Sequence, residues 1–489
     1  MTSQSAITAL APTKLWEIFD LFTQHPRPSR HEESVLQAIE ALCDQPELSH
    51  RRDEIGNLII SKPATAGMEN RQGVVMQGHI DMVPQKNADS DHDFEKDPIR
   101  TYIEDGWVSA HGTTLGADNG IGVAAALAVL VSTDIPHGPL ELLITIDEES
   151  GMTGAYGLKA GWLEGSILLN LDTEDEGELY VGCAGGVDIS ANIPMQYEAV
   201  ADDAIALEIA IRGLRGGHSG LDIDQGRGNA NKLLARFLLT YGDELGVRVA
   251  QFNGGTLRNA IARESFTHIC IPGANESKFM AQLNTFEQVV KTEYGTVEPN
   301  LTITADTIAL PSHVYTPESC NKVVQSVSAC IHGVTRMSPE FEGVVESSNN
   351  LAIVKSEGDV VSILCLARSL SDTARDDLGL SIKATFDMIG AQTKLSGEYP
   401  GWKPNPNSKV LTLMSEVYQK LYGVIPAVKV IHAGLECGLL GKPYPHWDMI
   451  SFGPTIRHAH SPDEKVHIES VEKFWEYLVA SLGQIPERN

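Results

Sequence analysis

Short apolar segments alternate with helical segments through residues 12–185, and this alternation constrains the fold more than any other feature of the sequence. Four apolar runs have the length of buried strands: 58–60, 73–76, 140–144 and 166–171. Three segments have helical periodicity or composition: 15–21, 33–42 and 119–131. Continuous apolar strands separated by helices are typical of a mostly parallel sheet that is buried on both faces. The sequence therefore predicts an α/β domain.

The pattern changes after Gly185-Gly186. Strands with two-residue alternation are predicted at 189–197 and 204–211, and further strands at 248–252, 265–271, 301–307 and 360–366. Helices are predicted at 229–241, 276–291 and 317–330. Helix, strand and helix then return after about residue 400, at 410–422, 449–452 and 471–482. We predict a discontinuous α/β domain formed by 1–186 and 399–489, with an α+β domain of 187–398 inserted in it.

The charge of the chain excludes some classes of partner. Sixty-five acidic and 37 basic residues give a net charge of -28, which opposes binding to nucleic acid or to an anionic membrane. Seven cysteines without a CxxC pair do not form the framework of a secreted disulfide protein. No signal peptide precedes the first helix, and the longest apolar run, Ile121–Val131, is about half of a membrane span. We expect a cytoplasmic protein.

Five residues of types that bind metals lie near the ends of the predicted strands or just before the helix predicted from residue 121. They are His79, Asp118, Glu149, Asp172 and His460. Open α/β sheets bind ligands beyond the carboxyl ends of their strands. Two imidazoles and three carboxylates suit two divalent ions of the zinc type, with one carboxylate shared between them. A two-metal site of this kind is suited to hydrolysis.

Each of these residues also has an ordinary structural interpretation. Asp118 and Asn119 are favoured helix N-cap residues, the acidic run at 147–149 suits a solvated turn, and a single histidine near a strand end is usually structural. The agreement of residue type and position across five places favours the metal site. Asp81, two residues after His79 on the same strand face, is placed to orient its imidazole.

Seven segments resemble the di-zinc exopeptidase family that includes carnosinases, peptidase T, aminoacylases and glutamate carboxypeptidase. These segments are GHIDMVP, GADNG, DEESGMTGA, LNLDTEDEGELYVGCAGG, GGHSGLDIDQGRGNA, HAGLECG and GPTIRHAHSP. The resemblance extends from about residue 12 to about residue 470. It is strongest to the members of the family that cleave aminoacyl-histidine (Xaa-His) dipeptides.

The resemblance implies how the metal ligands are divided. His79 and Asp172 hold one zinc ion, Glu149 and His460 hold the other, and Asp118 bridges the two. It also implies a cis peptide bond after Asp118. Two divalent ions are expected in each subunit, with zinc preferred and cobalt or manganese as alternatives.

The resemblance also implies catalytic and substrate-binding roles. Glu148 is the general base that takes a proton from the water between the metals, and His218 stabilises the oxyanion. Asn259 and Arg368 hold the dipeptide and its C-terminal carboxylate, for which a guanidinium is suited. Glu436 receives the α-amino group of the substrate.

The function implied is that of a metal-dependent dipeptidase acting on unblocked dipeptides, including Xaa-His dipeptides such as β-alanyl-histidine. A homodimer formed through the inserted domain is expected, because the histidine corresponding to His218 reaches the partner's active site in several relatives. Two alternatives remain open. One is a related amidohydrolase, either an N-acyl amino acid deacylase or a carboxypeptidase. The other is a non-catalytic amino-acid-binding protein on the same fold, against which the presence of Glu148 and all five ligands argues.

Overall fold

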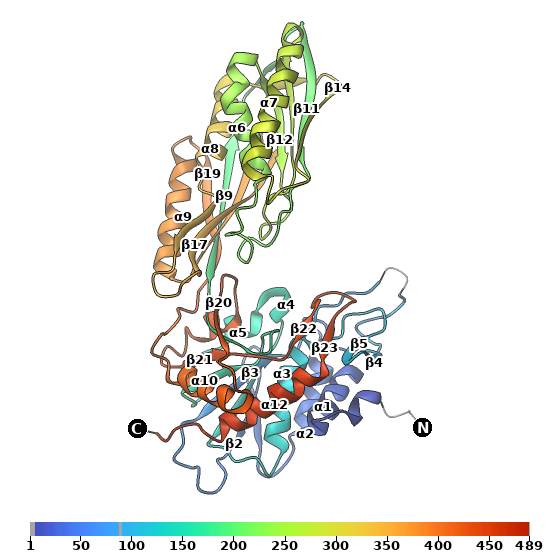
Figure 1. The fold of residues 1–489 in the computed structure, drawn as a ribbon, viewed down its shortest axis with the longest axis vertical. Helices are drawn as coiled ribbons and strands as arrows, with labels where there is room; N and C mark the ends of the chain where they lie inside the picture. The colour runs from blue at the N-terminus through green and yellow to red at the C-terminus, as the bar shows by residue number, and fades with distance from the viewer. Residues whose placement is uncertain (1–4, 88–89, 489) are drawn as a thin grey trace. The chain divides into compact units, whose positions relative to one another are not determined.

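The computed structural model describes residues 5–87 and 90–488, which form two compact units (Figure 1). The first unit contains the chain as far as Gly182, together with Pro404–Val430 and the segment from Leu435 onward. The second contains Cys183–Lys403 and Ile431–Gly434. The chain therefore leaves the first unit, completes most of the second and returns.

An eight-stranded sheet forms the centre of the first unit. Its order is β1 (Ser49–Arg52), β2 (Leu58–Lys62), β6 (Leu140–Thr145), β3 (Val74–His79), β7 (Ile167–Asn170), β21 (Asp448–Ser451), β8 (Glu178–Cys183) and β20 (Ala427–Ile431). The central strands β6, β3, β7 and β21 are parallel, whereas β1 and β2 are antiparallel to their neighbours. All residues of β3, β6 and β7 are buried, as their continuous apolar runs predicted. The predicted mostly parallel α/β fold is confirmed.

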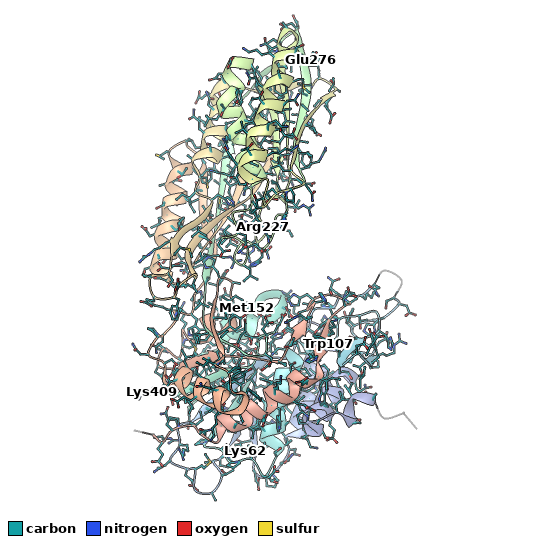
Figure 2. All side chains as sticks on the ribbon, in the orientation of Figure 1. Lys62, Trp107, Met152, Arg227, Glu276 and Lys409 are labelled. Atoms are coloured by element: carbon teal, nitrogen blue, oxygen red, sulfur yellow. The ribbon has the colours of Figure 1, made fainter. Side chains whose placement is uncertain are left out.

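Helices and a small second sheet complete this unit. The helices are η1 (Ala6–Ala9), α1 (Thr13–Gln24), α2 (Glu33–Leu42), α3 (Ala117–Val131), α4 (Glu148–Gly151), α5 (Thr153–Gly157), α10 (Lys409–Tyr422), α11 (Glu436–Leu440) and α12 (Ile468–Leu482). The small sheet has the order β22 (Ile456–Arg457), β23 (Lys465–His467), β5 (Trp107–Ala110) and β4 (Thr101–Glu104). Helix α3 is buried along nearly its whole length and packs on α1 and β3, which accounts for its small apolar residues. Met152, labelled in Figure 2, separates α4 from α5.

The second unit is built on an antiparallel nine-stranded sheet. Its order is β14 (Thr302–Ile308), β11 (Ala204–Arg212), β13 (Ser265–Pro272), β12 (Arg248–Gly254), β17 (Val345–Glu357), β18 (Val360–Ser369), β9 (Gly185–Pro194) and β19 (Gln392–Tyr399), and β16 (Gly333–Met337) pairs with β17. A two-stranded sheet joins β10 (Tyr197–Ala199) to β15 (His313–Tyr315). The helices are η2 (Gly273–Asn275), α6 (Ala230–Leu245), α7 (Glu276–Tyr294), α8 (Pro317–Ala329) and α9 (Asp372–Asp387). One continuous apolar core lies between the large sheet and these helices.

Two long elements of this unit were missed by the sequence analysis. Strand β17 carries the run Ser347, Ser348, Asn349 and Asn350, which is polar in sequence but buried in the structure. These side chains find hydrogen-bond partners inside the unit, as when Asn350 Nδ2 donates to the main-chain oxygen of Ala260 (2.8 Å). Helix α9 has a narrow apolar stripe and few apolar residues elsewhere. Neither segment therefore has the apolar pattern on which the predictions depended.

Helices long and apolar enough to cross a membrane do not occur in the described ranges, 5–87 and 90–488.

Candidate functional site

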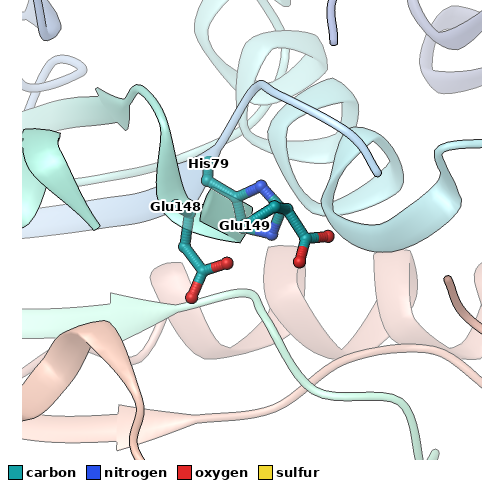
Figure 3. A group of neighbouring side chains, drawn as sticks. All are labelled: His79, Glu148 and Glu149. Atoms are coloured by element: carbon teal, nitrogen blue, oxygen red, sulfur yellow. The ribbon is translucent and has the colours of Figure 1, made fainter. Parts of the chain in front are cut away.

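The loops beyond the carboxyl ends of the central parallel strands carry the predicted metal-binding side chains. Strand β3 ends at His79, α4 begins at Glu148 shortly after β6, and Asp172 follows β7 by two residues. Three sets of possible ligand atoms lie within 4.8 Å of one another: His79, Asp118 and Asp172; Asp118, Glu149 and His460; and His79, Glu148 and Glu149 (Figure 3). The structure thus brings together all five ligands predicted from the sequence.

Asp118 lies between the two histidines of this cluster. Its Oδ1 is 3.2 Å from His79 Nε2, and its Oδ2 is 3.2 Å from His460 Nε2. On one side, His79 Nε2 is also 3.5 Å from Asp172 Oδ1, and on the other, His460 Nε2 is 3.1 Å from Glu149 Oε2. Each oxygen of Asp118 therefore faces a different group of ligands, which is the arrangement required of a shared carboxylate.

The start of helix α3 places Asp118. The helix begins at Ala117 after Gly116, with non-helical backbone at Asp118 and Asn119. The oxygens of the Asp118 side chain face His79 and His460 and not the backbone N–H groups of the helix, so they do not have the capping role considered as an alternative. The Asp118–Asn119 peptide bond is cis, which confirms the prediction drawn from the family resemblance. Asn119 Nδ2 donates a hydrogen bond to the main-chain oxygen of Leu171 (2.6 Å). This bond connects the Asp118 turn to the residue just before Asp172.

Asp81 contacts more of the site than the sequence analysis predicted. His79 Nδ1 lies 3.1 Å from the main-chain oxygen of Asp81 and 3.4 Å from its Oδ1. The carboxylate of Asp81 also accepts hydrogen bonds from the backbone N–H groups of Glu148 (3.0 Å) and Glu149 (3.1 Å) and from the hydroxyl of Ser29 (2.8 Å). Asp81 therefore fixes both the imidazole and the first turn of α4, which carries the two glutamates.

Glu148 and Glu149 follow each other in the chain but differ in their surroundings. Figure 3 shows their carboxylates pointing to different sides of the His79 ring. Glu149 faces His460, as described above. Glu148 is half-buried, and the partial desolvation of its carboxyl group raises its pKa well above the usual range, with a further contribution from the neighbouring Asp172 and Glu436. A carboxyl group with a raised pKa is suited to gain and lose a proton near neutral pH.

The charges of the cluster fit bound cations. Burial alone would lower the pKa of His79, but Asp172 and Asp118 raise it well above its usual value. Hydrogen bonds to Asp118 and Glu149 raise the pKa of His460 to about 11. The excess negative charge thus draws protons onto both imidazoles. A divalent cation would balance the same charge and leave the ring nitrogens free to bind it.

An unsatisfied atom supports the same interpretation. Glu149 Oε1 is buried and has no hydrogen-bond partner among the residues that the structure describes. A buried carboxylate oxygen without a partner is costly, and a metal ion is one of the groups that would satisfy it. Oxygen and imidazole nitrogen are also the donor atoms that zinc and similar ions accept. The residues present therefore fit a metal centre.

Glu436 lies in the same unit and is fully buried at the start of α11. Its Oε2 accepts hydrogen bonds from Gln77 Nε2 (2.6 Å) and Thr145 Oγ1 (2.7 Å), whereas its Oε1 has no partner within the described residues. Burial raises the pKa of this carboxyl group to about 7. Asn170 Nδ2 donates in turn to Gln77 Oε1 (2.6 Å), which fixes the direction of the Gln77 amide. One oxygen of Glu436 is thus held in place while the other is left to accept a donor.

The second unit contains His218, Asn259 and Arg368, which lie around Ser219. The N–H of Ser219 donates to the main-chain oxygen of Asn259 (2.8 Å), and Arg368 Nη2 donates to Ser219 Oγ (3.2 Å). The side chain of Asn259 is exposed, whereas Arg368 is 4% exposed. Arg368 Nη1 also donates to the hydroxyl of Tyr399 (2.7 Å). No ion pair of Arg368 with a carboxylate occurs in the described part of the chain.

The imidazole of His218 has a defined direction. Its Nδ1 accepts hydrogen bonds from the N–H groups of Gly220 (3.2 Å) and Leu221 (3.1 Å), which leaves the ring proton on Nε2. Burial lowers the pKa of His218 to about 4, so the ring is neutral at physiological pH. Gly217 has a φ of +123°, and a Cβ there would lie 2.0 Å from Arg227 Nη1, so this turn requires glycine.

Sequence analysis missed the residues that hold Arg368. Ser219 lies in the recognised GGHSG segment, but nothing in the sequence indicates that its hydroxyl binds Arg368. Tyr399 belongs to none of the recognised segments and approaches Arg368 only because β19 and β18 both pair with β9.

Comparison with known proteins identifies the family. Residues 75–484 match the model of "Peptidase family M20/M25/M40". The chain belongs to this peptidase family. It is 47% identical over 484 residues to the cytosol non-specific dipeptidase of Escherichia coli, which covers 99% of this chain and 100% of the relative. The family assignment made from the sequence is confirmed.

Two solved structures are similar to this chain over nearly its full length. The crystal structure of aminoacylhistidine dipeptidase from Vibrio alginolyticus matches with a TM-score of 0.94 and 49% identity, and the match covers 99% of both chains. Aminopeptidase PepT from Bacillus cereus matches with a TM-score of 0.57 and 18% identity over 97% of this chain and 99% of the other. The second match, at that identity, shows a common fold alone.

Proposed function

We propose that the protein is a metal-dependent dipeptidase that hydrolyses unblocked dipeptides, including Xaa-His dipeptides such as β-alanyl-histidine. The observation that carries this proposal is the cluster around Asp118, in a chain 47% identical to a dipeptidase over nearly its full length. The Vibrio alginolyticus relative is named for aminoacylhistidine substrates, which supports the inclusion of Xaa-His. The Escherichia coli relative is named as a cytosol enzyme, and we propose the same compartment for this protein.

In this proposal the cluster holds two divalent ions. His79 and Asp172 bind one, Glu149 and His460 bind the other, and Asp118 is shared. Zinc suits this donor set, with cobalt or manganese as alternatives. When bound, the two ions supply Lewis acidity at the substrate carbonyl and at the attacking water.

The carboxylate of Glu148 moves the proton. It accepts a proton from the attacking water at one carboxylate oxygen and then donates that proton to the nitrogen of the leaving amino acid. The raised pKa of its carboxyl group is consistent with both steps. Asp81 orients Glu148 through the backbone N–H bond described above.

Four further residues bind the substrate in this proposal. The free oxygen of Glu436 receives the α-amino group, a charge-assisted contact that an N-acylated substrate lacks. The guanidinium of Arg368, whose Nε and Nη2 donate to Ser219 and whose Nη1 donates to Tyr399, binds the C-terminal carboxylate together with Asn259. The Nε2–H of His218 is the donor for the oxyanion.

A dipeptide panel tests the function. The wild-type protein is expected to hydrolyse free dipeptides, β-alanyl-histidine among them, and to leave their N-acetylated forms uncleaved.

Chelation is expected to abolish this turnover without unfolding the chain, because the ligands lie at the ends of an already buried sheet. Added zinc, cobalt or manganese is expected to restore it. Glu436→Gln, measured beside the wild type, is expected to lose most of its preference for the free amine.

Other results would favour one of the alternatives. Faster cleavage of N-acyl substrates would indicate a deacylase, and release of single residues from the C-terminus of longer peptides would indicate a carboxypeptidase. Tight binding of dipeptides without turnover at any metal loading would indicate a non-catalytic binding protein. Full turnover after prolonged chelation would contradict a metal-dependent reaction.

We also propose a homodimer formed through the domain at 187–398. Strand β14 is an edge of the nine-stranded sheet, and the outer backbone groups of an edge strand can pair with a second copy.

A mixture of inactive Glu148→Gln and inactive His218→Ala chains is expected to regain part of the activity, because one hybrid site then contains an intact base and the partner's intact His218. No recovery despite subunit exchange would exclude action across the dimer, and a monomeric mass in sedimentation would exclude the dimer itself.

A further inference from the structure

Glu464 is a buried carboxylate that none of the steps above uses. It lies four residues after His460 and is 2% exposed. Its Oε2 accepts hydrogen bonds from the backbone N–H groups of Leu115 (2.7 Å) and Gly116 (2.9 Å), and its Oε1 accepts from those of Ala117 (2.7 Å) and Asp118 (3.3 Å). One side chain therefore binds four consecutive amides, the last of which belongs to the proposed bridging ligand.

The backbone turn at Gly116 makes this arrangement possible. Gly116 has a φ of +71°, in the left-handed region, and successive N–H groups around such a residue form a concave anion-binding nest. Glu464 fills this nest from the loop that also carries His460. The link thus connects Asp118 with His460, two ligands that are far apart in the sequence.

Arg27 forms a second link on the other side of the same turn. It is 2% exposed, its Nη1 donates to the main-chain oxygen of Ile80 (2.7 Å), and its Nη2 donates to that of Gly116 (2.6 Å). Ile80 follows His79 directly. A Cβ at Gly116 would lie 2.4 Å from Arg27 Nη2, so the guanidinium fits closely against this turn. Arg27 therefore connects the His79 segment to the segment that Glu464 holds.

We propose that Glu464 is a positioning residue that, together with Arg27, fixes Asp118 relative to His79 and His460 and thereby sets the affinity of the site for its metal ions. The inference rests on the proposed function, because it takes Asp118 as a metal ligand. The four hydrogen bonds that the Glu464 carboxylate accepts all come from the backbone N–H groups of residues 115–118, so it acts through Asp118. Mutation of a group that orients a metal ligand in this way typically lowers metal affinity or activity by about 10- to 100-fold.

The test compares two substitutions of Glu464 with a matched control. Glu464→Gln keeps the shape but turns one acceptor oxygen into an amide donor that faces two N–H groups, which is unfavourable in a buried position. Glu464→Asp keeps both acceptor oxygens on a shorter side chain. Glu141→Gln is the control, because Glu141 is also a buried glutamate whose carboxylate accepts two backbone N–H groups, those of Glu164 and Gly165 (2.8 Å each), at the start of β6.

Three quantities are measured for each chain: the unfolding temperature without metal, the zinc affinity by competition with a chromogenic chelator, and kcat and KM at saturating zinc. Glu464→Gln is expected to bind zinc about 10- to 100-fold more weakly than the wild type. Glu464→Asp is expected to recover part of this loss. Glu141→Gln is expected to bind zinc as the wild type does, even where its unfolding temperature falls.

Two results would overturn the inference while the proposed function stands. One is a wild-type zinc affinity in Glu464→Gln with only a lower unfolding temperature. The other is failure of both Glu464 variants to fold when Glu141→Gln folds, because Glu464 would then be required for the fold itself. A wild-type chain that binds no divalent ion would instead contradict the proposed function, and with it the premise of the inference.

Discussion

Replacing Glu148 by glutamine is expected to lower kcat for dipeptide hydrolysis by about 10²–10⁴-fold, the usual contribution of a positioned general base. The substitution preserves the size of the side chain and the backbone N–H bond to Asp81, since that bond does not involve the carboxyl group. Metal content is expected to stay at the wild-type level, because Glu149 and Asp118 face the histidines directly. Rate and bound metal are measured on the same preparation.

Glu149→Gln is the matched control for this experiment. It makes the same chemical change one residue later in α4, but in a side chain 3.1 Å from His460 Nε2. We expect it to weaken metal binding first and to recover much of its rate at high metal concentration. If Glu148→Gln loses metal and keeps its rate while Glu149→Gln does the reverse, the roles of the two glutamates are exchanged.

The general position of this site could be predicted from the sequence for a definite reason. Strands β3, β6 and β7 are buried on both faces, so their residues form continuous apolar runs. Polar residues that follow such runs then mark the carboxyl edge of the sheet, where parallel strands place their ligands. Asp172 directly follows its run, and His79 and Glu149 lie a few residues beyond theirs, so their general position could be predicted without any knowledge of tertiary contacts. Their division between two ions came from the family resemblance.

The groups that support the ligands could not be predicted in the same way. Glu464 binds amides almost 350 residues away in the chain, and Arg27 binds main-chain oxygens that no sequence pattern identifies. The bonds from the backbone of α4 to Asp81 likewise depend on how β3 and β6 are aligned. In each of these contacts a side chain binds a backbone group. Every residue type carries such groups, so the sequence does not indicate which residue is the partner, and the fold determines it.

The second unit shows a related limit. His218 could be singled out because its flanking glycines belong to a recognised segment, whereas Tyr399 carries no signal and is defined by its contact with Arg368. Strand β17 was missed because its buried serines and asparagines are polar in sequence. Buried polar residues whose hydrogen-bond partners lie elsewhere in the fold break the apolar pattern from which strands are predicted.

Asp118→Asn is expected to have the second large effect, and it tests the sharing of one carboxylate by two ions. Each oxygen of Asp118 lies 3.2 Å from a different histidine, so removing its charge weakens both halves of the cluster. We expect the affinity for both ions to fall further than it does when a residue that only supports a ligand is replaced, a change that typically costs about 10- to 100-fold. At limiting zinc, turnover is expected to disappear.

Asp172→Asn provides the comparison, because Asp172 faces His79 and belongs to one group of ligands only. We expect it to lose one ion and keep the other, whereas Asp118→Asn is expected to lose both together. Metal analysis after gel filtration gives the number of ions retained per chain, and circular dichroism verifies that each variant is folded. Loss of a single ion from Asp118→Asn would assign Asp118 to one site alone. The proposal that one carboxylate is shared by both groups of ligands would then be wrong.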